Sequence, residues 1–562
     1  MVVEIDSTRT PSDPSSSGAD TIIGILDIGI WPESESFIDE DMGPIPSHWK
    51  RKCMEGNNFT SSTWGNSCNR KMIGANYHVD PDSGMSSFGR DKSGHGTHVS
   101  STAAGRPVAG ASYYGLANGT VVGGSPASRI AIYRVCASGG CHGSAILKAF
   151  DNAMLMPDFA TDTIAIRAFH AVERGIIVAC SAGNSGPSSA TVVNVAPWIL
   201  TVAVTTIDRD FELDIVLGGN KVIKGGGITF SGLNKSAVYP LIDGDSAKSA
   251  SSQHDEVDAR NCIPCSLDDS KVKGKIVLQG AVGMILIDNY RRQVPSKYEA
   301  TNPIVVVTED DGAQILSYIN STSNPLATIL PTMVVQNYKP APVVADFSSR
   351  GPTYGIKNLL NPDITTLGVA ILAAWPSNDK RKALPDKEPP LSIYSQAPIQ
   401  IKNLHAPATT KSGLKATPYD IGAGEISLSC PLQPGLVYET ETIDYIQFLC
   451  NIGYDATEIK SIALDLPKNF SCSSDSSSDS ISNMNYPLIV VSKLKENESK
   501  MVSITVTNLD EEDSTYIAVV EVPTSINVQV VPNKLHFTKD VKKLLRKTCL
   551  GQLHGLVRSI NL

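Results

Sequence analysis

The sequence lacks any long hydrophobic run. Its longest apolar stretches, such as Ile22–Leu26 and Gly175–Cys180, have the length of a single strand, whereas a helix that crosses a bilayer needs about 20 apolar residues. This excludes an integral membrane protein. The first residues, Met1-Val-Val-Glu-Ile-Asp6, contain no basic group followed by an apolar stretch. We therefore expect no secretory signal in the chain as given.

Positive charge is also scarce. The 562 residues include 48 Lys and Arg against 57 Asp and Glu, a net charge of −9, which argues against nucleic-acid binding. We interpret the one basic cluster, near the C-terminal end, as a solvated face; it comprises Lys539, Lys542, Lys543, Arg546 and Lys547. With 41% hydrophobic and 19% charged residues, the composition is that of an ordinary globular protein, and the length predicts several domains.

Cysteine, by contrast, is plentiful. Eleven cysteines suit a secreted protein with scattered disulfides and one thiol left over, although the pairing cannot be read from their spacing. Six glycosylation sequons indicate the same compartment, while each can also occur by chance; they begin at Asn58, Asn118, Asn234, Asn320, Asn469 and Asn497. A thioredoxin-like role for Cys262-Ile-Pro-Cys265 is a weak alternative, because no redox-fold pattern precedes this motif.

Five segments are expected along the chain. They are a Pro/Ser-rich linker over residues 1–19, a first α/β part over 20–235, an inserted α/β unit over 236–335, the resumed first pattern over 336–465, and a small antiparallel β-sandwich over 484–562. In the first part, short apolar runs alternate with helical stretches, as in a doubly wound parallel sheet. The elements predicted there are strands over Arg129–Val135 and Gly175–Cys180 and helices over Ser144–Met156 and Thr163–Arg174. Ser471–Ser482, rich in serine, is predicted to be a flexible loop.

Two residues in the first part are candidates for acid–base chemistry. Asp27 ends the apolar run Ile22–Leu26, at the edge where open α/β folds place their sites, although an ordinary turn aspartate would look similar. His95 lies in Ser93-Gly-His-Gly-Thr-His98, whose glycines allow close backbone approach at the start of a helix. His95 and His98 could instead bind a metal, but no further ligand cluster accompanies them.

Asn184 is the third candidate. It lies between small residues in Ser181–Pro187, directly after an apolar strand, where its amide can act as a donor to a developing oxyanion. An ordinary turn would also explain it. The order of the set, an aspartate at a strand end, a histidine at a helix start and then Gly-Asn, favours the catalytic interpretation.

These stretches resemble the subtilisin-like serine proteases, specifically the plant subtilases. Asp20–Phe37 is similar to the family's aspartate motif, Ser93–Gly105 to its histidine motif and Ser181–Pro187 to its asparagine motif. Further family landmarks are Pro197–Ala203, Phe347–Pro352 and Gly435–Tyr438, and the stretches Leu217–Gly225 and Ala416–Asp420 resemble the subgroup that contains the carbon-dioxide-response secreted protease.

The resemblance implies a fold, a reaction and a compartment. The fold would be a subtilisin-like doubly wound sheet, with a protease-associated domain at 236–335 and a truncated fibronectin-III-like sandwich at 484–562. Asp27 would orient His95, His95 would be the general base, and Asn184 would bind the oxyanion. No cofactor or metal is expected. The partners would be polypeptide substrates or inhibitors, outside the cell in the apoplast.

The expected nucleophile is missing. In the family a Gly-Thr-Ser-Met-Ala segment follows the stretch that matches Ile371–Trp375, but here no Gly-Thr-Ser occurs, and the Gly-x-Ser-x-Gly elbow is also absent. The serines between Trp375 and Tyr419 are Ser377, Ser392, Ser395 and Ser412. None has the preceding glycine and following small-residue helix that would present its hydroxyl to a base, so we interpret all four as loop residues.

Other family features are also absent or altered. Only Pro157–Asp162 stands where relatives carry a central strand of the type Gly-Val-Asp-Val-Ile-Ser, and losing it would leave strand edges unpaired. We expect no family propeptide before residue 20 of the chain as given. By comparison with the family, Ile28 replaces the usual threonine, Gln279 replaces a cysteine, and Leu544–Leu562 loses strand alternation. We therefore expect a subtilase that is inactive or nearly so. The alternative is a non-catalytic pseudoprotease that binds polypeptides or partner proteins.

Overall fold

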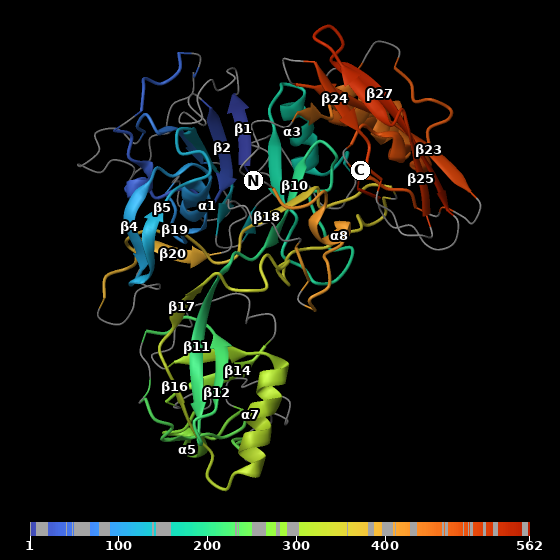
Figure 1. Cartoon of the computed structure of the whole chain (residues 1–562). Helices are drawn as coiled ribbons and strands as arrows, with labels where there is room; N and C mark the ends of the chain where they lie inside the picture. The colour runs from blue at the N-terminus through green and yellow to red at the C-terminus, as the bar shows by residue number, and fades with distance from the viewer. Residues whose placement is uncertain are drawn as a thin grey trace.

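The computed structural model describes residues 2–6, 21–40, 42–47, 49, 68–77, 90–137, 140–141, 159–230, 233, 235–249, 266–276, 282–288, 303–356, 358–379, 387–395, 408–410, 412–426, 435–463, 466, 470–486, 488–492, 494, 498–509, 513–520, 526–552 and 560–561. These residues form two seven-stranded sheets and a C-terminal group of smaller antiparallel sheets. The second sheet projects from the rest of the body (Figure 1).

The first sheet has the strand order β18-β10-β9-β1-β2-β6-β3. Its strands are β1 (Val2–Asp6), β2 (Ile22–Asp27), β3 (Met72–Tyr77), β6 (Arg129–Arg134), β9 (Val178–Ser181), β10 (Leu200–Thr205) and β18 (Ile364–Leu367). All pairings are parallel except those of β1, which is antiparallel to both neighbours. Parallel strands that are covered on both faces have nearly continuous apolar sequences.

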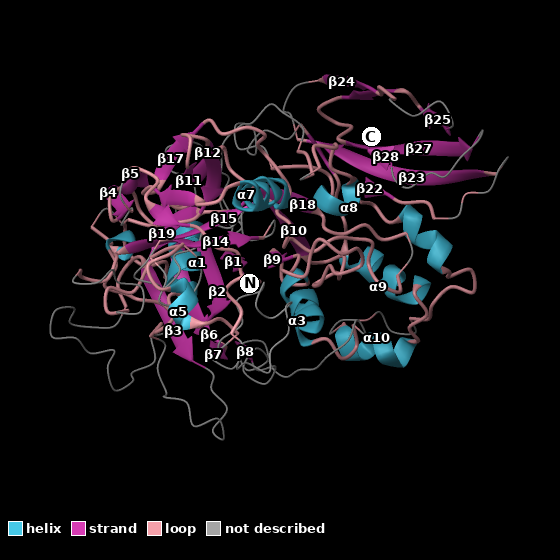
Figure 2. Ribbon diagram, turned by 90° about the horizontal axis from the view of Figure 1, so that it is seen from below, coloured by secondary structure: helices cyan, strands magenta, loops and turns pink. Residues whose placement is uncertain are grey.

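The two faces of β2 show that helices cover both sides of the sheet. Ile23 and Ile25 pack in one core cluster with the end of helix α1 (His95–Ala104). Ile22 and Leu26 pack in another with helix α3 (Thr163–Val172). Helices α9 (Thr442–Asn451) and α10 (Ala456–Ile462) lie beside α3 (Figure 2). The doubly wound α/β architecture is thus confirmed. The helix expected over Ser144–Met156 lies outside the described residues.

Strand β1 differs from the linker expected over residues 1–19. It lies inside the sheet, between β2 and β9, and pairs with both. β1 therefore connects the two parallel halves of this sheet, β3-β6-β2 on one side and β9-β10-β18 on the other. A local sequence reading misses such a strand, since its partners lie about 20 and 175 residues away.

The second sheet has its own core. Its strands are β11 (Arg209–Leu217), β12 (Val222–Gly226), β13 (Tyr239–Pro240), β14 (Met284–Ile287), β15 (Ile304–Val307), β16 (Leu326–Ile329) and β17 (Met333–Gln336), with helices α5 (Asp269–Val272) and α7 (Glu309–Ser321). Leu213, Val305 and Ile329 are fully buried between them. The sheet starts at Arg209, ahead of the boundary expected at residue 236, because β11 and β12 pair with strands of the insert.

The C-terminal part consists of antiparallel strands. They are β21 (Leu436–Val437), β23 (Ser499–Asn508), β25 (Ile526–Val531) and β27 (Lys543–Gln552) in one sheet, β24 (Ser514–Ile517) with β26 (Lys534–Phe537), and β22 (Leu488–Ile489) with β28 (Ile560–Asn561). The stretch Leu544–Leu562, whose sequence loses strand alternation, nevertheless contains most of β27 and the short strand β28. β27 pairs with β23 on one side and with β25 on the other. Its adjacent leucines break the alternation of apolar and polar residues, so the strand is defined by its backbone pairing and not by its sequence pattern.

The remaining elements connect these parts. They are the hairpins β4 (Val108–Tyr113)–β5 (Leu116–Val121), β7 (Cys136–Ala137)–β8 (Gly140–Cys141) and β19 (Ile371–Ala374)–β20 (Ser392–Ser395), helices α8 (Pro418–Ile421), α9 (Thr442–Asn451) and α10 (Ala456–Ile462), and 3-10 turns η2 (Glu35–Phe37) and η5 (Ser478–Asn483). The serine-rich stretch expected to be a flexible loop is anchored instead. Cys472 is disulfide-bonded to Cys450, and Ile481 is buried.

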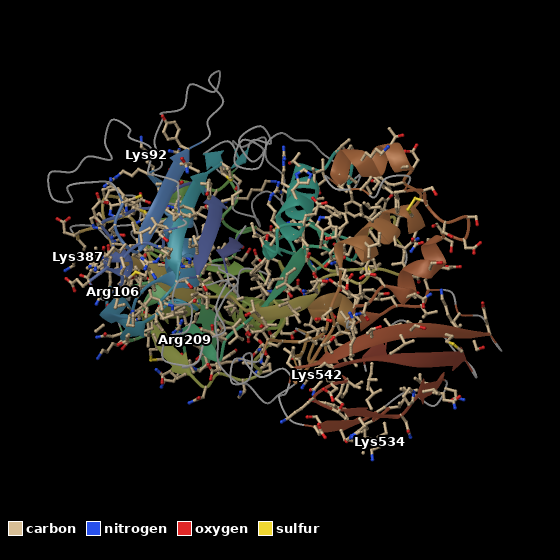
Figure 3. The ribbon with its side chains drawn as sticks, turned by 90° about the horizontal axis from the view of Figure 1, so that it is seen from above. Lys92, Arg106, Arg209, Lys387, Lys534 and Lys542 are labelled. Carbon is tan, nitrogen blue, oxygen red and sulfur yellow. A yellow bond between two sulfur atoms is a disulfide. The ribbon has the colours of Figure 1, made fainter. Side chains whose placement is uncertain are left out.

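The basic side chains labelled in Figure 3 fall into two groups: Lys92, Lys387, Arg106 and Arg209 lie over one part of the molecule, and Lys534 and Lys542 lie over the C-terminal strands. In the C-terminal cluster, Lys543 lies 3.3 Å from Glu439 and 3.8 Å from Glu441, as expected for a solvated face with mixed charges. No described helix combines the length and apolar character needed to cross a bilayer.

A buried carboxylate joins the first sheet to the C-terminal part. Asp363, which directly precedes β18, accepts hydrogen bonds from the Thr201 backbone N–H at 2.6 Å and from the hydroxyl of Tyr486. Burial raises the pKa of Asp363 to about 7, against the opposing effect of these hydrogen bonds. An acid whose pKa is raised on folding stabilises the fold below its unfolded pKa, and that contribution is lost as pH rises through the folded pKa.

Asp363→Asn is therefore expected to remove a pH dependence. Between the ordinary aspartate pKa of 3.8 and about 7, native stability should fall relative to the variant by up to about 1.4 kcal/mol per pH unit. Urea unfolding across this pH range measures the difference. Parallel stability curves for the native chain and Asp363→Asn would contradict the assignment.

Candidate active site

Asp27 lies at the carboxyl end of β2, in the middle of the first sheet. Its side chain is 7% exposed, and its Oδ1 accepts a hydrogen bond from the Ile28 backbone N–H at 2.7 Å. Ile28 thus supports the carboxylate through its backbone. A buried carboxylate needs such donors, because burial without them is costly.

Asp91 organises the start of α1. One carboxylate oxygen accepts from the backbone N–H groups of Ser93 and Gly94, and the other accepts from the backbone N–H and the hydroxyl of Thr97 at 2.9 and 2.6 Å. The Thr97 hydroxyl oxygen in turn accepts from the Trp31 backbone N–H. These bonds satisfy N–H groups that a helix start leaves without partners. The sequence reading missed Asp91, although a carboxylate shortly before a helix is a recognised start signal.

Glycine is required on both sides of His95. A Cβ on Gly96 would lie 2.0 Å from the Gly29 carbonyl oxygen, and one on Gly94, whose φ is +93°, would lie 2.1 Å from the Trp375 indole. The helix start therefore lies directly against the loop that follows β2. This contact brings His95 to Asp27 across 68 residues of sequence.

His95 and Asp27 form a hydrogen-bonded pair. The Nδ1 of His95 lies 2.8 Å from Oδ1 and 3.0 Å from Oδ2 of Asp27. Burial raises the pKa of Asp27, but the hydrogen bond and charge of His95 outweigh it and bring the pKa below 3.8. Since the carboxylate is ionised, Nδ1 is the donor, and neutral His95 keeps a lone pair on Nε2. The hydrogen bond to Asp27 raises the pKa of His95 against the opposing effect of burial.

His98 is not placed beside His95 as a second ligand. Its Nε2 lies 3.1 Å from the carbonyl oxygen of Ile371, and its ring stands edge-on to Trp375. No group of three or more His, Cys, Asp or Glu side chains with metal-binding geometry occurs among the described residues. The contacts of His98 instead hold α1 against strand β19.

Asn184 follows β9 and is exposed, as a donor for an incoming ligand must be. Because β2 and β9 are both antiparallel to β1, their carboxyl ends share one edge of the sheet, so Asp27 and Asn184 lie on the same edge. The Ser349 hydroxyl oxygen accepts a hydrogen bond from the Ser185 backbone N–H at 3.1 Å and so holds the turn that contains Asn184. This gives the family landmark Phe347–Pro352 a physical role.

No hydroxyl hydrogen-bonds to His95 in the part of the chain that the structure describes; its partners there are the two oxygens of Asp27. Ser392 is buried in β20, opposite Ala374. Ser377 is exposed, and the Ser412 hydroxyl contacts that of Thr410. Ser395 pairs with Ile371 through its backbone.

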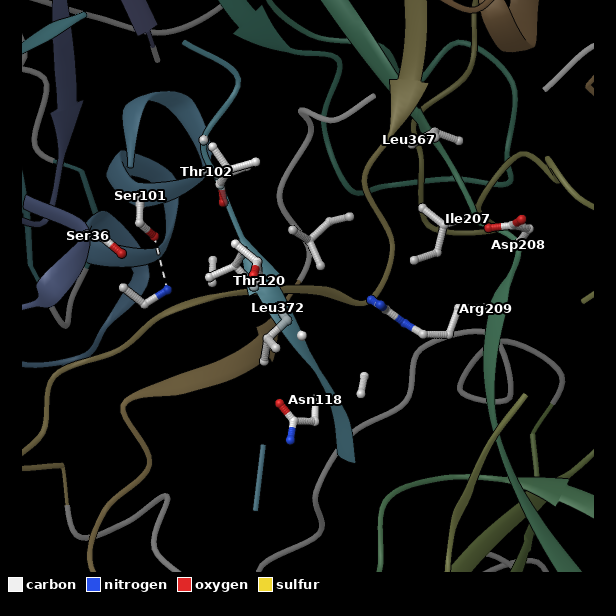
Figure 4. A pocket seen from close by; sticks show the side chains of 18 of the residues that line it. Ser36, Ser101, Thr102, Asn118, Thr120, Ile207, Asp208, Arg209, Leu367 and Leu372 are labelled. Atoms are coloured by element: carbon white, nitrogen blue, oxygen red, sulfur yellow. Dashed lines mark hydrogen bonds between the residues drawn. The ribbon is translucent and has the colours of Figure 1, made fainter. Parts of the chain in front are cut away.

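A cavity of about 440 Å³ lies at the other end of α1. Figure 4 shows Ser101 and Thr102 of α1 on one side and Arg209, at the base of the second sheet, on the other. Asp27, His95 and Asn184 are not among its lining residues. The cavity is thus separate from the aspartate–histidine pair, whose imidazole is 60% exposed.

A family model described as the subtilase family matches residues 18–389, and a fibronectin type-III domain model matches residues 483–546. The chain belongs to the subtilase family. The Asp27–His95 pair and Asn184 lie within the residues that this family model matches.

Curated plant subtilases match this subtilase over nearly all its length. The CO(2)-response secreted protease of Arabidopsis thaliana is 49% identical, covering 99% of this chain and 81% of that protein. Subtilisin-like proteases SBT5.1 and SBT5.3 of the same plant are 42% and 36% identical, covering 93% and 96% of this chain and 76% and 78% of those proteins. The first alignment spans 631 positions, more than the 562 residues here, so that relative contains internal segments that this subtilase lacks.

Gly96→Ala is expected to lower the free energy of unfolding by about 1–3 kcal/mol, because the new methyl group overpacks the contact with Gly29. The melting temperature measures this. Gly119→Ala in β5 is the matched control, since a Cβ there meets nothing within 4 Å. Equal melting temperatures for the two variants would show that the contact is not tight.

Asp27→Asn is expected to lower the pKa of His95 toward or below 6.5, its ordinary value. The histidine Cε1 proton, followed by NMR over pH, reports this pKa. Because folding raises the pKa of His95, its stabilising contribution is present below pH 6.5 and is lost as pH rises through the folded value. Asp39→Asn, which removes a partner of Arg70, should leave His95 unchanged; an unchanged pKa in Asp27→Asn would refute the pairing.

Proposed function

We propose that this chain is a subtilase that retains the general base of the serine-protease mechanism, lacks its nucleophile, and does not cleave peptide bonds. The observation that carries the proposal is the Asp27–His95 pair at 2.8 Å with no hydroxyl partner for His95 among the described residues. The absence of Gly-Thr-Ser from the sequence supports it. A general base contributes to acyl transfer only when a nucleophile lies within hydrogen-bond reach.

The retained residues have roles that follow from the mechanism. Asp27 would hold His95 in the tautomer with its proton on Nδ1, and Nε2 would accept a serine proton and return it to the leaving amine. The Asn184 amide would donate to the oxyanion. Its exposed position at the same sheet edge as Asp27 supports this role.

The segment after Trp375 supports the loss of the nucleophile. The Trp375 backbone N–H donates to the Leu391 carbonyl at 2.8 Å, and β20 returns along β19 with Ser392 opposite Ala374. The hairpin ends at Ser395, beyond which Gln-Ala-Pro stands in place of Gly-Thr-Ser. The longer relative is consistent with an internal deletion at this point.

A second candidate function is polypeptide binding without hydrolysis. It is favoured by the second sheet and the C-terminal strands, each of which has its own buried core. We assign the second sheet, expected over 236–335, to a protease-associated domain. The partners would be polypeptide substrates or inhibitors of the kind that subtilases bind.

We place the protein outside the cell. The disulfide Cys450–Cys472 favours an oxidising compartment, and one relative is named a secreted protease. The sequon residues Asn118 and Asn320 are exposed, as glycan attachment requires. The other four sequons lie outside the described residues, as do Cys262 and Cys265.

A fluorophosphonate probe tests the proposal, because it labels serines activated by a neighbouring base. The native chain should not be labelled. A repaired chain, in which the Gly-Thr-Ser helix of a relative is inserted after Ser395, should gain labelling and lose it again with His95→Ala. Removing the serine alone costs about 10⁶-fold in kcat in a subtilisin, so the contrast should be large. Stoichiometric labelling of the native chain would overturn the proposal.

A further inference from the structure

One strand of the first sheet runs against all the others. β1 is antiparallel to β2 and β9, whereas the remaining pairs in that sheet are parallel. It lies between the strand that ends in Asp27 and the strand that leads to Asn184. We call the space between β2 and β9 the strand slot.

The strand slot needs an occupant. All six residues of β2 are buried, as are Val178 and Cys180 of β9. Without a strand between them, two backbone edges in the middle of the core would lose their partners. Burying N–H and C=O groups without partners is costly, so an empty slot would be strongly unfavourable.

The present occupant fits the strand slot imperfectly. β1 forms two residue pairs with β9, and its register with β2 is irregular between Glu4 and Asp6. Its sequence, Val-Val-Glu-Ile-Asp, places carboxylates at two of five positions. A strand flanked on both sides in a covered sheet favours continuous apolar, β-branched residues. An occupant without these carboxylates should therefore compete with β1.

We propose that the strand slot is a binding site for an extended polypeptide strand of about five residues, rich in β-branched apolar side chains, and that β1 is its replaceable in-chain occupant. The backbone edges of β2 and β9 would supply affinity, and the alternate side-chain positions would supply selectivity, as in other cases of strand addition. Val2 pairs with Ile25 and Ala179, so one end of a bound strand lies at the sheet edge of Asp27. The proposal does not depend on whether the chain hydrolyses peptides.

The test uses the full chain and a labelled peptide probe, Lys-Val-Val-Thr-Ile-Thr-Lys, with fluorescence anisotropy as the readout. Val3→Pro opens the slot, because Val3 pairs with both Gly24 and Val178 and proline cannot donate to a ladder. Glu4→Val should keep the slot occupied by β1, because it replaces a carboxylate with an apolar β-branched side chain that suits a covered sheet. Ser16→Pro and Glu388→Val are the matched controls, since the first lies in the Pro/Ser-rich stretch and the second at an exposed position.

Relative to the native chain, Val3→Pro should bind the probe at least tenfold more tightly and Glu4→Val at least tenfold more weakly, with both controls unchanged. Equal affinity of all variants would overturn the proposal. If Val3→Pro does not fold, the melting temperature of Glu4→Val decides: a rise above that of Glu388→Val supports the slot, and no rise refutes it. A mass of twice 59.8 kDa by light scattering would assign the strand to a second copy and refute in-chain occupancy.

Discussion

The close contact between the start of α1 and the loop after β2 is the constraint on which the site depends. Because Gly96 lies against the Gly29 carbonyl, the helix cannot shift without separating His95 from Asp27. The carboxylate of Asp91 and the β19 strand hold the helix from other sides. The geometry of the acid–base pair therefore depends on the packing of the helix as well as on the hydrogen bond between the two side chains. Under the proposed function, this packing would keep the pair in place without a nucleophile.

Buried polar contacts also connect other parts of the fold. Arg350, in the landmark behind the Asn184 turn, lies 3.1 Å from Asp420 in a second landmark, and both side chains are largely buried. Asp363 links the first sheet to Tyr486. Pairs of this kind are costly to break singly, because removing one member leaves a buried charge without its partner. The motifs that identify the family are thus also the contacts that connect its parts.

The candidate site could be proposed from the sequence more directly than the sheet around it, and its catalytic role remains a prediction. Asp27, His95 and Asn184 follow from motifs in a fixed order, and β6 and α3 follow from apolar periodicity. β1 and β27 do not, because one carries two carboxylates and the other adjacent leucines, and both depend on pairing with distant strands. Asp91 was missed because its partners are backbone N–H groups and the Thr97 hydroxyl, which a search for catalytic side chains ignores. The domain boundaries remain predictions.

The central claim is that a correctly oriented histidine has no hydroxyl to deprotonate. The most direct measurement is the rate at which the purified native chain and its His95→Ala variant hydrolyse an unstructured, fluorescently labelled protein under the same conditions. The account predicts equal rates for both, at the level of buffer alone. A native rate more than tenfold above that of the variant would contradict it.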